Sequence, residues 1–212
     1  LGPLQRAIEL ADGTSGIRED LEVAHRNSLR LQKLVNTLLD FSRIEAGRMP
    51  YHFSRADLNG IVREVMDRYA DHLREKGFEP ALLLEADLPP VRADAEAVQE
   101  ALINLIDNGM KYSTAETYLR IATGRLHGMA FVDVEDHGIG IHRKHQEKVF
   151  EMFYRITDGL VQTTRGSGLG LPLVRHIMRA HGGDVTLTSA PGTGSTFRLL
   201  FPLFREEGPQ SD

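Results

Sequence analysis

The chain has 212 residues, a formal net charge of −5 and no cysteine. A mildly acidic chain is a poor partner for nucleic acid, because neutralising phosphates requires a basic surface. Without cysteine there are no disulfides and no thiolate metal sites. No apolar run approaches the length of a membrane span. We therefore expect a cytoplasmic globular protein that contacts neither nucleic acid nor membrane through these residues, built as one large domain or as a domain plus a smaller element.

The first fifty residues are predicted to be helical. A short helix to about Leu10 and a turn cluster precede a long helix from about Ile17 to Ala46, which Gly47 and Pro50 end. The long helix has a heptad seam, with steps of three and four residues. The seam consists of Leu21, Ala24, Ser28, Leu31, Val35, Leu38 and Ser42. So narrow a seam on a long helix favours partner helices in a bundle, and the alternative is a helix packed within one domain.

From Tyr51 onward the pattern changes to mixed helices and strands. Asp57 and Asp94 are placed to cap helices that run to about Lys76 and Lys111. Strands are predicted at 81–85, 118–123, 130–135, 184–189 and 195–201, and a further helix at 169–180. The segment 136–167 is polar and glycine-rich with short helices, and the tail from Arg205 is polar and predicted to fray.

One face of the second capped helix has an unusual polar row. Glu100, Asn104, Asn108 and Lys111 step by four, four and three residues, so they share one side of the helix. Amide oxygens suit a hard cation such as Mg²⁺, lysine suits phosphate oxygens, and a carboxylate can polarise water or a nucleophile. The alternative for the row alone is a solvated helix face.

Two glycine-rich segments have the composition of ligand-binding turns. Asp136–Gly140 follows a strand directly, where an aspartate can accept from an exocyclic amine and bare glycines admit a flat ligand; the alternative is a simple turn. Gly166–Leu171 opens a helix, with Pro172 in its first turn, so its N–H groups can face an anion. It is neither a P-loop nor a dinucleotide fingerprint, since no Lys-Ser/Thr follows and no strand leads straight into it.

The segment Phe150–Arg155 lies between the two glycine clusters. Two phenylalanines three residues apart usually belong to a core. The following stretch, Thr157–Arg165, is polar and has the composition of a mobile lid, whose hinge or clasp the aromatics would form. Arg155, at the base of that lid, could reach a terminal phosphate.

The order of these motifs resembles the catalytic domain of bacterial sensor histidine kinases, within the gyrase/Hsp90/histidine kinase/MutL superfamily. The resemblance extends from about Asp57 to Pro202. It rests on an N box, a first glycine box, an F box, a second glycine box and a third glycine box, at Asn104–Ser113, Asp136–Gly140, Phe150–Arg155, Gly166–Leu171 and Gly192–Gly194. Upstream, Leu29–Arg48 is similar to the second helix of the family's dimerisation and phosphotransfer domain.

The resemblance implies an α+β fold, a two-layer α/β sandwich of the Bergerat type, with a mixed sheet covered on one face by helices. It also implies a helical-hairpin remnant of a four-helix bundle at 1–50, an ATP-binding catalytic domain at 51–204 and a disordered tail at 205–212. The family forms homodimers through the helices of the first segment.

The family's residue roles can be transferred onto this chain. Asn104 would hold Mg²⁺, Asn108 and Lys111 would contact phosphates, and Glu100 would be an acidic helper. In the same way, Tyr112 would pack near adenine, Asp136 would bind its amine, and Arg155 would approach the γ-phosphate. The remaining residues implied to line the nucleotide are Gly138, Gly140, Phe150, Phe153, Gly166, Ser167, Gly168, Leu169, Gly170 and Thr196.

The implied activity is that of a protein-histidine kinase, which transfers the γ-phosphate of Mg-ATP to a histidine for relay to the receiver domain of a response regulator. The family's His-Glu-x-x-x-Pro box is absent, so the acceptor is expected upstream of Leu1, and the fragment alone is not expected to autophosphorylate. His25 lies on the second helix and is not expected to be the acceptor. The alternatives are an ATP-hydrolysing or serine-kinase relative with Glu100 as base, and a nucleotide-dead scaffold that only dimerises.

Overall fold

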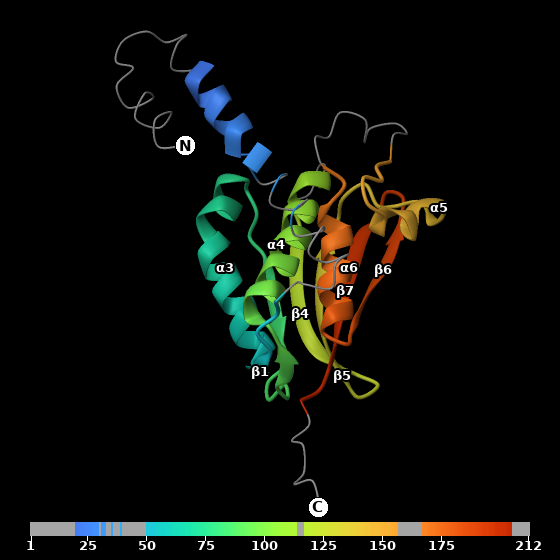
Figure 1. The fold of residues 1–212 in the computed structure, drawn as a ribbon. Coiled ribbons are helices and arrows are strands. Elements are labelled where there is room, and N and C mark those ends of the chain that lie inside the picture. The colour runs from blue at the N-terminus through green and yellow to red at the C-terminus, as the bar shows by residue number, and fades with distance from the viewer. Residues whose placement is uncertain are drawn as a thin grey trace, which may run out of the picture. The chain divides into compact units, whose positions relative to one another are not determined.

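The computed structural model describes residues 20–29, 31, 32, 35, 39, 50–113, 117–156 and 167–204 (Figure 1). The chain divides into two compact units, residues 1–49 and 50–212. The domain limits proposed from the sequence stay a prediction. Across the part of the chain that the structure describes, no helix is both long enough and apolar enough to cross a membrane.

The described residues of the first unit lie within the predicted long helix. Residues 20–29 are helical, as are 31, 32, 35 and 39. Leu31 and Val35 of the predicted seam are 62% and 47% exposed. The predicted first helix to Leu10 and the seam positions Leu38 and Ser42 lie outside the described residues.

The second unit is built on a five-stranded sheet of order β2-β4-β5-β7-β6. Its strands are β2 (Ala81–Leu84), β4 (Leu119–Leu126), β5 (Met129–Asp136), β6 (Asp184–Ala190) and β7 (Gly194–Pro202). The β2–β4 pair is parallel and the other pairs are antiparallel, so the sheet is mixed. A separate two-stranded sheet pairs β1 (Ser54–Ala56) with β3 (Val91–Ala93).

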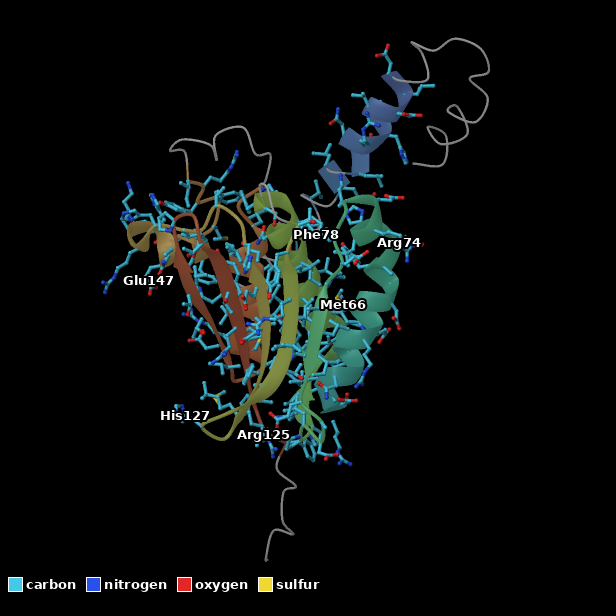
Figure 2. All side chains as sticks on the ribbon, turned by 180° about the vertical axis from the view of Figure 1, so that it is seen from behind. Met66, Arg74, Phe78, Arg125, His127 and Glu147 are labelled. Carbon is cyan, nitrogen blue, oxygen red and sulfur yellow. The ribbon has the colours of Figure 1, made fainter. Side chains whose placement is uncertain are left out.

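Three helices pack on one face of the five-stranded sheet, which we call the covered face. They are α3 (Leu58–Glu75), α4 (Ala95–Tyr112) and α6 (Gly170–Ala180) (Figure 1). Figure 2 shows the opposite face, the open face, where the described strands have no helix layer over them. Two short helices, α5 (Arg143–Gln146) and η1 (Lys148–Phe150), follow β5.

The period of two in the strands separates the two faces. In β7, Phe197, Leu199 and Phe201 are buried on the covered face, because alternate residues of a strand point to the same side. The residues between them point to the open face. There Arg198 donates to both carboxylate oxygens of Asp133 on β5, each at 2.7 Å. Paired charges thus cover a face that the helices leave to solvent.

The predicted helix caps are confirmed. Asp57 accepts a hydrogen bond from Asn59 N at 2.9 Å and starts α3. Asp94 accepts from Ala97 N at 3.1 Å and starts α4. Strands β1 and β3 were not predicted, because three residues are too few to establish an alternating pattern.

A fully bonded polar cluster joins the beginning of α3 to β2 and β4. The buried Thr123 hydroxyl donates to Asn59 Oδ1 at 2.6 Å and accepts from Glu85 N at 3.1 Å. Asn59 Nδ2 donates to Glu85 O at 2.8 Å. Thr123 therefore supplies a donor to the buried Asn59 Oδ1 and an acceptor to the part-buried Glu85 N.

Replacing Thr123 by valine keeps the shape of the side chain and removes its hydroxyl. Asn59 Oδ1 then loses its donor and Glu85 N its acceptor, so we expect the free energy of unfolding to fall by about 2 kcal/mol. Urea unfolding followed by circular dichroism measures this. The matched control is Thr188→Val on the exposed side of β6, which should change stability by less than about 0.5 kcal/mol. Equal effects of the two substitutions would contradict the role of the cluster.

Candidate functional site

The polar row on α4 meets the beginning of α6. Asn104 Nδ2 donates to Glu100 O, one turn earlier, at 2.9 Å. This bond leaves Oδ1 of Asn104 as the group directed outward, and a Cβ atom added at Gly170 would lie 2.9 Å from it. An amide oxygen, a group that suits a hard cation, therefore lies beside the helix start that the sequence predicts to face an anion.

The C-terminal end of α4 contacts the turn that follows β5. Ile139 N donates to Tyr112 O at 3.1 Å, and Ser113 forms an isolated bridge with Gly138. A Cβ atom at Gly138 would lie 2.5 Å from Tyr112 O, so only glycine fits this approach. Lys111 Nζ donates to the Tyr112 hydroxyl at 2.9 Å. The N box and the first glycine box are therefore neighbours.

Asp136 lies buried at the end of β5, below this turn. Its Oδ1 accepts from Gly138 N at 2.8 Å. Burial raises the pKa of Asp136 above its ordinary value, while the backbone N–H groups of Gly138 and Ser195 favour the charged form. A Cβ atom at Gly109 of α4 would lie 3.5 Å from Asp136 Cβ, which places the carboxyl against the inner side of α4.

The same turn contacts the hairpin between β6 and β7. Gly140 has φ +65°, and a Cβ atom there would lie 1.9 Å from Ala190 O. Gly192 N donates to Ile139 O at 2.8 Å. The first and third glycine boxes are thus held together by backbone contacts.

The segment before α6 contacts the F box. Phe153 N donates to Gly168 O at 3.0 Å, and Phe153 itself has φ +60° and is 61% exposed. Ser167 Oγ accepts from Leu169 N at 3.3 Å. Within the described part of the chain no side chain caps α6 at Leu169, so the N–H groups of Gly170 and Leu171 meet no capping side chain there. The helix start can therefore take an anion, as the sequence predicts.

Three of the predicted lining residues lie elsewhere. Phe150 is buried against Phe197, with ring centroids 6.4 Å apart, and Leu169 is 3% exposed, so both belong to the core. Thr196 pairs with Glu135, which places it on the open face, away from Asp136. Core packing and strand alternation direct these side chains away from the turn, and their assignment to the nucleotide stays a prediction.

Ser195 is the residue that the sequence reasoning missed. It pairs with Asp136 across β5 and β7 and is buried on the covered face. Its Oγ lies 3.0 Å from Ser189 Oγ. The period of two could have found it, because Ser195 lies two residues before Phe197 and so shares its face.

The other predicted residues lie on α4, in the F box or outside the described residues. Asn108 is half-buried on α4 between Asn104 and Lys111, while Glu100 and Arg155 are exposed. Gly166 and the predicted lid residues 157–165 lie outside the described residues. Their roles stay predictions.

The donor set fits a divalent cation that shares its ligands with a bound phosphate chain. Asn104 offers one hard amide oxygen, and Mg²⁺ is usually held by one or two protein oxygens together with phosphates. Among the described residues, no group of three or more histidine, aspartate or glutamate side chains could hold a metal by itself.

Residues 93–205, more than half of the chain, match the family described as histidine kinase-, DNA gyrase B- and HSP90-like ATPase. The chain belongs to this family.

The similar proteins are sensor kinases. Sensor histidine kinase TmoS of Ectopseudomonas mendocina is 31% identical over 213 residues, covering 98% of this chain and 22% of TmoS. Sensor-like histidine kinase SenX3 of Mycolicibacterium smegmatis is 31% identical over 205 residues, covering 95% of this chain and 52% of SenX3. Full-length ShkA in complex with AMPPNP has a TM-score of 0.80 and 26% identity, covering 98% of this chain and 44% of ShkA. This chain thus spans about half, or less, of these relatives.

These comparisons confirm the resemblance to the ATP-binding domain of bacterial histidine kinases. They also confirm the predicted fold class, a mixed sheet packed against helices, to which the structure adds β1 and β3.

Substituting Gly140 with alanine tests the close contact between the turn and the hairpin. A Cβ atom would displace Ala190, so we expect a loss of about 3 kcal/mol or more in unfolding free energy. The control is Gly128→Ala, in the β4–β5 hairpin at the opposite end of β5 from the Asp136–Gly140 turn. Its neighbour His127 is labelled in Figure 2. Gly128 also has positive φ (+79°) but nothing within 4 Å of the added Cβ, so it should lose only about 1 kcal/mol. Equal losses in thermal unfolding would contradict the contact.

Proposed function

We propose that this chain binds Mg-ATP and donates the γ-phosphate to a protein histidine. The observation that carries the proposal is the junction of three motifs. The end of α4 contacts the Asp136–Gly140 turn through Tyr112, and Asn104 of the same helix lies against the start of α6. The named relatives are histidine kinases, and ShkA was solved with an ATP analogue.

In this proposal Asp136 recognises the adenine. Its Oδ1 is occupied by Gly138 N, and the other carboxylate oxygen can accept from the exocyclic amine. Burial strengthens that bond, because little water competes for the oxygen. Ser195, which faces Asp136 across the sheet, is the second polar group at this position. Gly138 and Gly140 keep side chains out of the space that a flat base would use.

The phosphate chain would lie along α4 towards α6. Asn104 Oδ1 would hold Mg²⁺, Asn108 and Lys111 would contact phosphate oxygens, and the free N–H groups at the start of α6 would add donors. The ion, when bound, supplies neutralisation of phosphate charge. These groups position the γ-phosphate for an in-line attack by an imidazole nitrogen, which is the main contribution a protein makes to phosphoryl transfer.

The acceptor, the partners and the location are proposed from the family. We propose that the histidine lies in a segment before Leu1, that the phosphoryl group passes to the receiver domain of a response regulator, and that residues 1–50 pair two copies of the chain. Exposed Leu31 and Val35 on the described part of the helix support the pairing. A cytoplasmic location is consistent with an ATP-dependent reaction.

Thermal unfolding with and without Mg-ATP tests binding directly. A ligand that binds only the folded state must raise the midpoint temperature of unfolding as its concentration rises. At a hundredfold excess over Kd, the free energy of unfolding increases by about 2.7 kcal/mol. An unchanged midpoint at saturating nucleotide would contradict the proposal.

Lys111→Met should weaken binding, since it removes a phosphate contact of about 1–3 kcal/mol.

Asp136→Asn tests recognition of the base. The amide places a donor where the amine needs an acceptor, so we expect Kd for Mg-ATP to rise about tenfold to a hundredfold by calorimetry. The control is Asp133→Asn, which removes the same charge from the open face of β5 and should leave Kd nearly unchanged.

The same carboxyl gives binding a pH dependence. Because burial raises the pKa of Asp136, protonation removes its acceptor at a higher pH than for an exposed aspartate, so affinity should fall as pH is lowered through that raised value. Asp136→Asn should abolish this part of the pH dependence. The same pH profile in wild type and variant would assign the effect to another group.

A further inference from the structure

A buried histidine lies where three segments meet, at the end of α4 opposite to the nucleotide-binding junction. His181 is 6% exposed and ends α6. Its Nδ1 lies 2.7 Å from Ile177 O, and its Nε2 accepts from Asp94 N at 3.0 Å. A carbonyl oxygen can only accept, so Nδ1 has the proton and Nε2 is bare. The two bonds therefore fix the neutral form and its tautomer.

Asp94 forms hydrogen bonds with three different segments. Its Oδ1 caps α4 through Ala97 N, and its Oδ2 accepts from His52 N at 2.7 Å. His52 belongs to residues 50–53, by which the chain enters the second unit and which we call the entry segment. Asp94 and His181 thus connect the entry segment to the beginning of α4 and to the end of α6.

Aromatic side chains enclose the imidazole of His181. The rings of Tyr51 and Phe53, from the entry segment, lie edge-on to it with centroids at 5.5 and 4.9 Å. On β7, Phe201 lies at 6.2 Å. The entry segment is therefore packed on the same histidine to which it is indirectly hydrogen-bonded.

The charges around His181 do not compensate its burial. Asp94 is the charged group that acts on the imidazole, and it favours the protonated form. The nearest positive groups act on its neighbours: Arg179 lowers the pKa of His176 on α6, and Arg92 of β3 lies over the Phe53 ring at 5.2 Å. Burial has the largest effect and lowers the pKa of His181 below its ordinary value of 6.5. Protonation would also place an N–H on Nε2 directly against the N–H of Asp94.

We propose that His181 is a positioning residue that, while neutral, holds the entry segment to the nucleotide-binding helix α4, and that its protonation releases this anchor. Neutral Nε2 holds Asp94, and Asp94 holds His52 and the first turn of α4. Asn104 lies ten residues from Asp94 on that helix, about 15 Å at the rise of an α-helix. A change at the anchor therefore acts on the helix that bears the phosphate-facing row.

The direction of the pH effect follows from the lowered pKa. Because the folded state favours neutral His181, the anchor is intact above the ordinary histidine pKa. It is lost as pH falls through the lower value in the folded protein. An acid-sensitive entry segment is thus expected, with α3 and the sheet still folded.

Amide hydrogen exchange of the 212-residue chain, corrected for intrinsic rates, measures the anchor without nucleotide. We expect the amides of His52 and Asp94 to lose about tenfold or more of their protection as pH is lowered through the His181 titration. His181→Gln keeps an acceptor for Asp94 N that cannot be protonated, so this variant should keep its protection. The same loss in both proteins, or no loss in wild type, would overturn the proposal.

A second pair of variants separates the anchor from helix capping. Asp94→Ser keeps a cap for α4 and removes the acceptor of His52 N, so at neutral pH it should expose the entry segment as acid does in wild type. Asp57→Ser makes the matched change at the cap of α3, which has no bond to the entry segment, and should leave His52 protected. An unprotected His52 in both variants would reduce the anchor to a capping effect.

Mg-ATP affinity is a further readout of the effect on α4, and this arm rests on the proposed function. Asp94→Ser should weaken nucleotide binding about threefold to tenfold, and His181→Gln should remove the matching acid-dependent loss. Absence of nucleotide binding in wild type would overturn the proposed function, whereas the exchange data would still decide on the anchor. Normal affinity in Asp94→Ser with an exposed entry segment would overturn the coupling to α4.

Discussion

The arrangement of the candidate site depends on the backbone approach between the turn after β5 and its two neighbours. Tyr112 O takes a hydrogen bond from Ile139 N on one side, and Gly140 lies against Ala190 O on the other. These contacts leave no space for a Cβ atom, so glycine is required by the packing of main chain on main chain. A polar helix face, a buried carboxylate and a hairpin are thereby brought to one end of the sheet, although they are far apart in the sequence.

Burial gives Asp136 its chemical character. A carboxyl at the end of a central strand, with Gly138 N bonded to its Oδ1 and Ser195 as a second backbone donor, is held in place before any ligand arrives. The cost of desolvating the charge is offset in part by those donors, and a ligand that supplies another donor offsets it further. On the opposite face of the same strand, Asp133 is paired with Arg198, which already supplies donors to its carboxylate. Two aspartates three residues apart therefore have different surroundings, because the strand turns them to different faces.

The sequence was sufficient where local chemistry determines structure. Asp57 and Asp94 were recognisable as caps, because the side-chain acceptor and the helix start are adjacent in the chain. The glycine boxes were recognisable from order and spacing. Strands β1 and β3 were not, since their pairing joins residues about 37 positions apart over only three residues each. Thr196 was named and Ser195 was missed, although the period of two in β7 places Ser195 on the same face as Phe197.

Helix α4 is capped by Asp94 and ends at Tyr112, so a single rigid helix connects the entry segment to the proposed nucleotide-binding residues. Coupling between two binding sites is reciprocal. If a proton on His181 weakens the binding of a ligand at the other end of α4, that ligand must weaken the binding of the proton by the same free energy. Binding of a nucleotide would then make the imidazole of His181 a weaker base. The affinity of this buried ring for a proton would therefore report whether a nucleotide is bound at the other end of the helix.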